Sequence, residues 1–203
     1  LFGGGFDPVH RAHVQMAKTA ADQLGLNSVR WIPSGNPMHK EIHASAKHRL
    51  NMLRLALKNL KDERMVIDQR ELNNSITTHS YTCETIKSLR KDFPLKRFFW
   101  ILGEDQLLNF KSWKNWKWLL RNLVLAPCRR PEHSFKKKKN FNDLSETIKS
   151  LEGYGGKIKV LDINPDNVSS SCIRELIGKR QNPLNVLDKA VYDYVKKNNL
   201  YLN

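Results

Sequence analysis

Residues 3–13 read G-G-G-F-D-P-V-H-R-A-H, and they carry the strongest functional signal in the chain. Three glycines follow the apolar pair Leu1 and Phe2, and His10 and His13 stand where a helical pattern begins. This order indicates a strand that turns through a glycine-rich loop into a helix, whose first N–H groups and dipole favour a phosphate. If the helix begins near His10, both histidine rings lean to one side of its first turn. The stretch therefore indicates a phosphate site that carries two proton donors.

A second interpretation of this loop has to be kept beside the first. Glycine-rich turns join strands to helices in many α/β proteins that bind nothing there, and a short motif is a hypothesis until its context is known. The loop does not have the G-x-x-x-x-G-K-[S/T] pattern of a P-loop. It also lacks G-x-G-x-x-G followed by an acidic residue about 20 positions later, so a dinucleotide fingerprint is absent.

Composition restricts the class of protein. The chain has 203 residues, of which 40% are hydrophobic, and its mean hydropathy is −0.57. These values suit one globular domain over residues 1–203, and Leu1 reads as the middle of a first strand that is truncated at the N-terminus. No apolar run approaches the roughly 18 residues of a membrane span, so we expect no membrane partner. The three widely spaced cysteines favour a reducing cytoplasm over a disulfide framework or a zinc site.

The net charge of +15 arises from 35 Lys and Arg against 20 Asp and Glu. Such an excess attracts polyanions, whether nucleotides, nucleic acid or membrane surfaces. Much of it is lysine on expected helix faces and in the block 136–139, so charge alone does not choose the partner. A basic nucleic-acid-binding protein is the rival from a different class. We expect no nucleic-acid partner, because there is no recognition motif and the aromatic residues are not interleaved with the lysine block.

Helical and strand patterns alternate along the rest of the chain. Helices are expected at 12–24, 44–60, 81–91, 141–151 and 186–197, and strands at 28–33, 65–68, 97–102, 123–127 and 158–163. Residues 71–80 are expected to form a polar loop. With the first strand, this order predicts a doubly wound α/β fold, Rossmann-like, with helices on both faces of a mostly parallel sheet of about six strands.

Two segments place polar groups at the expected carboxyl edge of the sheet, where open α/β sheets bind ligands. The loop 34–43 carries His39 and Lys40, which would reach an anionic group or would simply be solvated. Residues 168–174, V-S-S-S-C-I-R, open a helix with three hydroxyls, and Arg174 follows about one turn later. This is either a second anion site, which would converge with the first loop, or a serine-rich cap without a ligand.

The most apolar expected strand runs directly into Gly103 and an acidic pair. Asp105 would accept hydrogen bonds from a ribose or help to hold a metal, and a plain N-cap of the next helix is an equally good interpretation. Trp113, Trp116 and Trp118 follow. Their spacing suggests that one or two of them are buried in the core and that another faces a pocket, where it would be a stacking surface. For any single tryptophan, a place in the core is the better expectation.

Several motifs in this order resemble the Rossmann-like adenylyltransferases of the nucleotidyltransferase family. Besides residues 3–13 and 168–174, the matching segments are W-I-P-S-G-N-P-M-H-K (31–40), S-Y-T (80–82), G-E-D-Q-L-L-N-F-K-S-W (103–113) and C-R-R-P (128–131). From end to end the chain is similar to the bacterial nicotinate-nucleotide adenylyltransferases. It departs from them at Gly5, where the family usually has Thr, at Ala12 for Gly, at Ser171 for Thr, and at Lys114, where relatives often have an aromatic residue.

The resemblance implies transfer of AMP from ATP to nicotinic acid mononucleotide, with Mg²⁺ to neutralise the pyrophosphate and few protein ligands for the metal. His10 and His13 are the implied catalytic residues. The implied ATP contacts are Gly3, Gly4, Gly5, Phe6, His10, His13, Gly103, Asp105, Ser169, Ser170 and Arg174. The implied acceptor contacts are His39, Lys40, Tyr81, Thr82 and Trp113, with Trp113 stacked on the pyridine ring and the Tyr81–Thr82 segment at the carboxylate.

The nearest rival is a sister adenylyltransferase with another acceptor, either nicotinamide mononucleotide or phosphopantetheine. Phosphopantetheine enzymes are shorter and should lack the Trp113 region. The sequence leaves open whether the chain forms a homo-oligomer.

Overall fold

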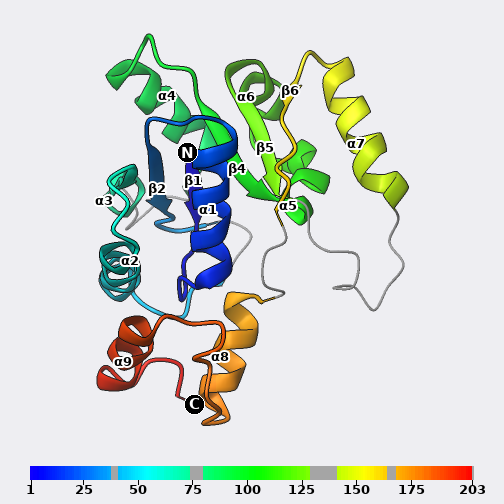
Figure 1. Cartoon of the computed structure of the whole chain (residues 1–203). Helices are drawn as coiled ribbons and strands as arrows, with labels where there is room; N and C mark the ends of the chain where they lie inside the picture. The colour runs from blue at the N-terminus through cyan, green and yellow to red at the C-terminus, as the bar shows by residue number, and fades with distance from the viewer. Residues whose placement is uncertain (38–40, 74–79, 129–140, 164–167, 203) are drawn as a thin grey trace.

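The computed structural model describes residues 1–37, 41–73, 80–128, 141–163 and 168–202 (Figure 1). Within them six strands form one sheet. The strands are β1 (Phe2–Gly4), β2 (Val29–Pro33), β3 (Met65–Ile67), β4 (Phe99–Gly103), β5 (Val124–Cys128) and β6 (Lys157–Ile158). Their order is β3-β2-β1-β4-β5-β6, and every pairing is parallel. The order reverses between β1 and β4, which confirms the predicted doubly wound fold and places its switch point at the glycine-rich loop.

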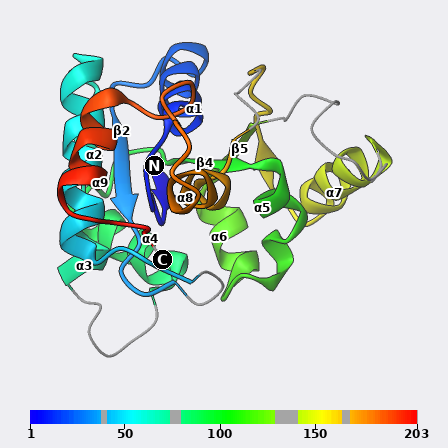
Figure 2. The same ribbon diagram turned by 90° about the horizontal axis from the view of Figure 1, so that it is seen from below.

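The described helices cover both faces of this sheet (Figure 2). They are α1 (Arg11–Gln23), α2 (Ala46–Leu60), α3 (Arg70–Asn73), α4 (Thr82–Asp92), α5 (Glu104–Leu108), the 3-10 turn η1 (Phe110–Ser112), α6 (Trp116–Asn122), α7 (Phe141–Gly153), α8 (Ser170–Gly178) and α9 (Lys189–Lys197). Helices α8 and α9 lie together at one end of the molecule, close to the C-terminus (Figure 1). No helix in the described part of the chain has the length and apolar character needed to cross a membrane.

Two apolar cores lie on opposite sides of the sheet because successive strand residues point to opposite faces. Trp31 and Ile101 pack with α1, α2, α8 and α9 in one core. Their neighbours Ile32, Trp100 and Leu102 pack with α4, α5, α6 and α7 in the other core. Strands that are buried on both faces read as continuous apolar runs, which is why the sequence predicts β2 and β4 well.

Three elements differ from the prediction. The predicted loop 71–80 begins with the helical turn α3, since the Asp68 carboxylate accepts hydrogen bonds from both the backbone N–H and the guanidinium of Arg70. The tryptophan-rich segment contains the short helix α6, which no pattern in the sequence predicted. The last strand is much shorter than the predicted 158–163, because β6 ends at Ile158 and, within the described residues, one isolated bridge from Cys128 to Leu161 continues the pairing.

Candidate active site

The loop that joins β1 to α1 is shaped by two core aromatic rings. A Cβ on Gly3 would lie 2.7 Å from the indole of Trp100, and a Cβ on Gly4 would lie 3.1 Å from the ring of Phe6. Phe6 itself has a φ of 48°, in the left-handed region, and its buried ring packs 5.2 Å from that of Trp31. Gly3 and Gly4 therefore make room for side chains of the protein. Gly5 lines a cavity.

Asp7 joins this loop to two distant parts of the chain. Its carboxylate is 3% exposed, and it accepts hydrogen bonds from the backbone N–H groups of His43 at 2.7 Å and Ala44 at 3.1 Å. The hydroxyl of Tyr201 donates a third hydrogen bond at 2.6 Å, across 194 residues of sequence. A buried carboxylate with three donors is well satisfied, so Asp7 fixes the position of the loop.

Arg49 of α2 supports the same loop from beneath. Its side chain is 1% exposed and donates to three backbone carbonyls: Gly5 at 2.8 Å, Ala44 at 3.2 Å and Gly35 at 3.4 Å. Burial lowers the pKa of the guanidinium, and the charge of Asp7 opposes that shift. One side chain thus connects the loop after β1 to the loop after β2.

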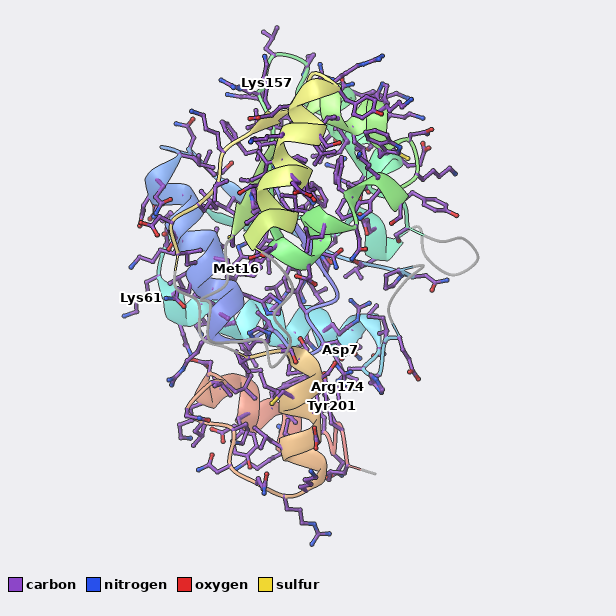
Figure 3. All side chains as sticks on the ribbon, turned by 90° about the vertical axis from the view of Figure 1, so that its right-hand side faces the viewer. Asp7, Met16, Lys61, Lys157, Arg174 and Tyr201 are labelled. Carbon is purple, nitrogen blue, oxygen red and sulfur yellow. The ribbon has the colours of Figure 1, made fainter. Side chains whose placement is uncertain are left out.

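The amino end of α8 meets the β1 loop, and Asp7, Arg174 and Tyr201 lie close together there (Figure 3). Ser170 Oγ donates to the carbonyl of Pro8 at 3.0 Å, and Arg174 donates to the carbonyl of Asp7 at 2.8 Å. Between the two segments lies a cavity of about 270 Å³, which we call the loop cavity. It is lined by Gly5, Phe6, Asp7, Glu41, Ile42, His43, Ser170, Ser171 and Arg174. The two expected anion sites, which are far apart in the sequence, are thus neighbours in space.

The polar groups of α8 are suited to an anion. Ser169 is the N-cap, and its hydroxyl accepts a hydrogen bond from the N–H of Cys172 at 3.1 Å. Arg174 also donates to Ser171 Oγ at 3.2 Å, which holds the guanidinium beside the cavity. The first N–H groups of a helix and a guanidinium together favour phosphate oxygens.

His10 and His13 lie at the start of α1 as the sequence predicts. His10 is the N-cap and is 6% exposed, and the two imidazole rings lie 3.7 Å apart at an angle of 32°. The backbone N–H of His10 donates to Nδ1 of His13 at 3.3 Å. A neutral imidazole that accepts at Nδ1 carries its proton on Nε2, which makes Nε2 of His13 a hydrogen-bond donor.

Gly103 and Asp105 lie at the carboxyl end of β4, next to the switch point. Gly103 is the N-cap of α5, so Asp105 is not the plain N-cap that the sequence left open. A Cβ on Gly103 would lie 2.7 Å from Oδ1 of Asp105, so glycine lets that carboxylate approach the backbone. Asp105 is exposed at this edge. Its position suits contact with a ligand bound above the strand ends.

Tyr81, Thr82 and Trp113 lie on a second part of this edge. Tyr81 is the N-cap of α4 and makes no side-chain capping hydrogen bond. The half-buried Trp113 packs against Phe110 and Trp100, with ring centroids 5.2 and 6.1 Å away. Lys114, the residue after Trp113, places Nζ 4.0 Å from the centre of the Tyr81 ring. The segments around Tyr81 and Trp113 are therefore adjacent. His39 and Lys40 lie outside the described residues.

A largely buried carboxylate, Glu71, organises this second part. It accepts hydrogen bonds from the hydroxyl of Thr85 at 2.6 Å, from the backbone N–H of Gly35 and from the hydroxyl of Ser80. Burial raises the pKa of Glu71, while these three donors oppose the shift. The side chain thus joins the loop after β2 to the beginning of α4.

The sequence singled out none of Asp7, Arg49, Glu71 and Tyr201. Arg49 had a usable signal, because it shares the apolar face of α2 with Met52, Leu53 and Ala56, and a charged residue at such a position is rarely buried without a purpose. Glu71 and Tyr201 had no such signal, since their partners are set only by the tertiary fold.

Replacing Tyr201 by phenylalanine tests the connection to Asp7. Burial and the hydrogen bond to Asp7 raise the pKa of the Tyr201 hydroxyl, so this group stays protonated and donates. Its loss leaves one oxygen of a buried carboxylate short of a donor, and we expect the free energy of unfolding to fall by about 1–3 kcal/mol in urea denaturation. Tyr192→Phe is the matched control, because in the described part of the chain its hydroxyl makes no hydrogen bond. Equal effects of the two substitutions would contradict the assignment.

Comparison with known proteins gives a consistent result. The cytidylyltransferase-like family model matches residues 1–176. A probable nicotinate-nucleotide adenylyltransferase of Chromobacterium violaceum is 35% identical over 214 residues, which cover 99% of this chain and 97% of that protein. A protein of the same description from Neisseria meningitidis is 32% identical, with 99% and 96% covered. The solved structure of Plasmodium falciparum nicotinic acid mononucleotide adenylyltransferase complexed with NaAD has a TM-score of 0.79 at 20% identity, with 98% and 95% covered, and supports the fold.

Proposed function

The chain belongs to the cytidylyltransferase-like family, and within it to the nicotinate-nucleotide adenylyltransferases, so we propose that the loop cavity is where it binds the phosphates of ATP. The protein is a nucleotidyltransferase of NAD biosynthesis. It transfers AMP from ATP to nicotinic acid mononucleotide, giving deamido-NAD and pyrophosphate.

One observation carries the placement of the site. Ser170 and Arg174 of α8 bond directly to the backbone of the β1 loop, at Pro8 and Asp7. The amino end of α8 therefore lies against the β1 loop, with the loop cavity between them, at the switch point of the sheet. Transfer of a phosphoryl group needs alignment and neutralised charge more than covalent help, and this arrangement supplies both.

In this proposal the 5′-phosphate of the mononucleotide attacks the α-phosphorus of ATP in line, and pyrophosphate leaves. His13 donates a hydrogen bond from Nε2 to the phosphate oxygens, where negative charge develops. The ring of His10 lies against the ring of His13. Ser169, Ser170 and Arg174 hold the ATP phosphates from the other side. The remaining proposed ATP contacts are Gly3, Gly4, Gly5 and Phe6 of the β1 loop, and Gly103 and Asp105 at the adenosine ribose. No nucleophilic side chain takes part.

Enzymes of this family use ATP and are generally metal-dependent, and we propose Mg²⁺ as the metal. Among the described residues, no group of three or more His, Cys, Asp or Glu side chains is placed to hold an ion. In this proposal phosphate oxygens and water would supply most of the ligands of Mg²⁺, which is common for this ion. When bound, it neutralises charge on the leaving pyrophosphate.

The acceptor is proposed to bind at the second part of the edge. Trp113 offers a half-buried ring as a stacking surface for the pyridine, supported from behind by Trp100 and Phe110. The backbone at Tyr81 and Thr82, which opens α4, would receive the carboxylate. His39 and Lys40 remain the proposed contacts of the acceptor phosphate.

Release of pyrophosphate from ATP tests the proposal. We expect turnover with nicotinic acid mononucleotide and a lower rate with the amide, nicotinamide mononucleotide. The measurement is the kcat/KM for each acceptor at saturating ATP. A rate with the amide that equals or exceeds the rate with the acid would overturn the acceptor assignment.

A further inference from the structure

Lys114 holds a positive charge at the proposed acceptor site. It is exposed, it directly follows Trp113, and its Nζ lies 4.0 Å from the centre of the Tyr81 ring. Asn115, the next residue, reaches the same part of α4, since its side-chain amide lies 3.8 Å from Sγ of Cys83. The backbone on both sides of Lys114 is therefore anchored, by the packing of Trp113 and by Asn115, and the cation over Tyr81 is part of an ordered arrangement.

No described carboxylate neutralises the charge of Lys114. In the part of the chain that the structure describes, no Asp or Glu forms an ion pair with it, whereas Lys87 pairs with Glu84 and Lys179 with Glu175. The other lysines of the segment point elsewhere: Lys111 donates to Ser150, and Lys117 lies over the rings of Trp116 and Tyr154. Lys114 is thus the described lysine that faces the Tyr81 segment.

We propose that Lys114 is a specificity-determining residue that favours the acid acceptor over the amide. The inference rests on the proposed function, because it assumes that the pyridine ring stacks on Trp113 with its carboxylate toward Tyr81. Nicotinic acid mononucleotide carries a carboxylate where nicotinamide mononucleotide carries a neutral amide. A fixed ammonium attracts the carboxylate and gains nothing comparable from the amide. Both acceptors have the same pyridinium charge and the same phosphate, so those contributions cancel in the ratio of the two substrates.

The experiment compares the acid-to-amide ratio of kcat/KM in the wild-type protein and in Lys114→Gln. An exposed charge close to a carboxylate is worth roughly a factor of ten in binding, so we expect the ratio to fall about tenfold. The change should lie in the KM for the acid, with kcat and the constants for the amide nearly unchanged. Lys114→Arg should keep most of the ratio. Lys117→Gln, which removes the same charge three residues away, should leave the ratio as it is.

The possible outcomes distinguish a failure of the role of Lys114 from a failure of the proposed function. An unchanged ratio in Lys114→Gln overturns the role of Lys114 while the wild-type enzyme still prefers the acid. An equal loss with both acceptors also overturns it, because that result indicates a structural effect. If the wild-type protein turns over neither acceptor, the proposed function has failed, and the inference fails with it. A smaller effect of Lys114→Gln at high ionic strength would further support an electrostatic origin.

Discussion

Replacing Arg49 by alanine is expected to lower the free energy of unfolding by about 3–5 kcal/mol. The substitution removes the buried positive charge that balances the charge of Asp7, and it takes away the donor of three backbone carbonyls. Those carbonyls belong to Gly5, Gly35 and Ala44, which lie on two loops of the site. The β1 loop should therefore lose its shape even in the molecules that stay folded. Urea denaturation measures the stability, and pyrophosphate release measures the activity.

Arg54→Ala is the matched control for this experiment. Arg54 lies on the same helix and is exposed, and among the described residues it donates only to Asn51, at 3.5 Å. Its removal should change the free energy of unfolding by no more than about 0.5 kcal/mol. Arg49→Lys should remain strongly destabilised, since a single ammonium cannot reach carbonyls in three directions. If Arg49→Lys keeps full stability, the site requires only the positive charge, and not the several N–H donors of the guanidinium.

His13→Ala is expected to reduce kcat by on the order of 10² or more, if the imidazole stabilises charge in the transition state. The side chain is only half-buried, so the variant should stay folded, and its unfolding midpoint should remain close to that of the wild type. His48→Ala is the control, because His48 lies on α2 and its ring nitrogen faces the Tyr194 hydroxyl. A His13 variant with normal turnover would remove this residue from the proposed chemistry.

The architecture could be predicted because its signals are local. The apolar runs of β2 and β4, the helical spacing between them and the glycine-rich turn each depend on neighbours in sequence, and parallel connections restrict the topology. The short helices α3 and α6 were missed because a few residues carry too little periodicity to identify a helix. Strand β6 was predicted too long because an apolar pattern does not show where a partner strand stops.

In the candidate site, too, the residues in local motifs could be predicted and the residues with distant partners could not. His10, Ser170 and Arg174 stand in short motifs with a clear chemical meaning, and the structure brings their two segments together. The residues that hold those segments in place could not be found from local pattern. Arg49 joins the loop after β1 to the loop after β2, and Glu71 joins the loop after β2 to the beginning of α4, so their roles exist only after folding.

The hydrogen bond between Tyr201 and Asp7 has a consequence for how the protein is made. A loop near the beginning of the chain receives its last donor from a residue 194 positions later. At about 5–20 residues per second, ribosomes need about 10–40 s to add that length. During this interval β1 and α1 can form, but the Asp7 carboxylate still lacks the donor that Tyr201 provides. The residues of the described strands are therefore all synthesised before the loop after β1 can receive its last donor, and translation itself sets the earliest moment at which this loop is complete.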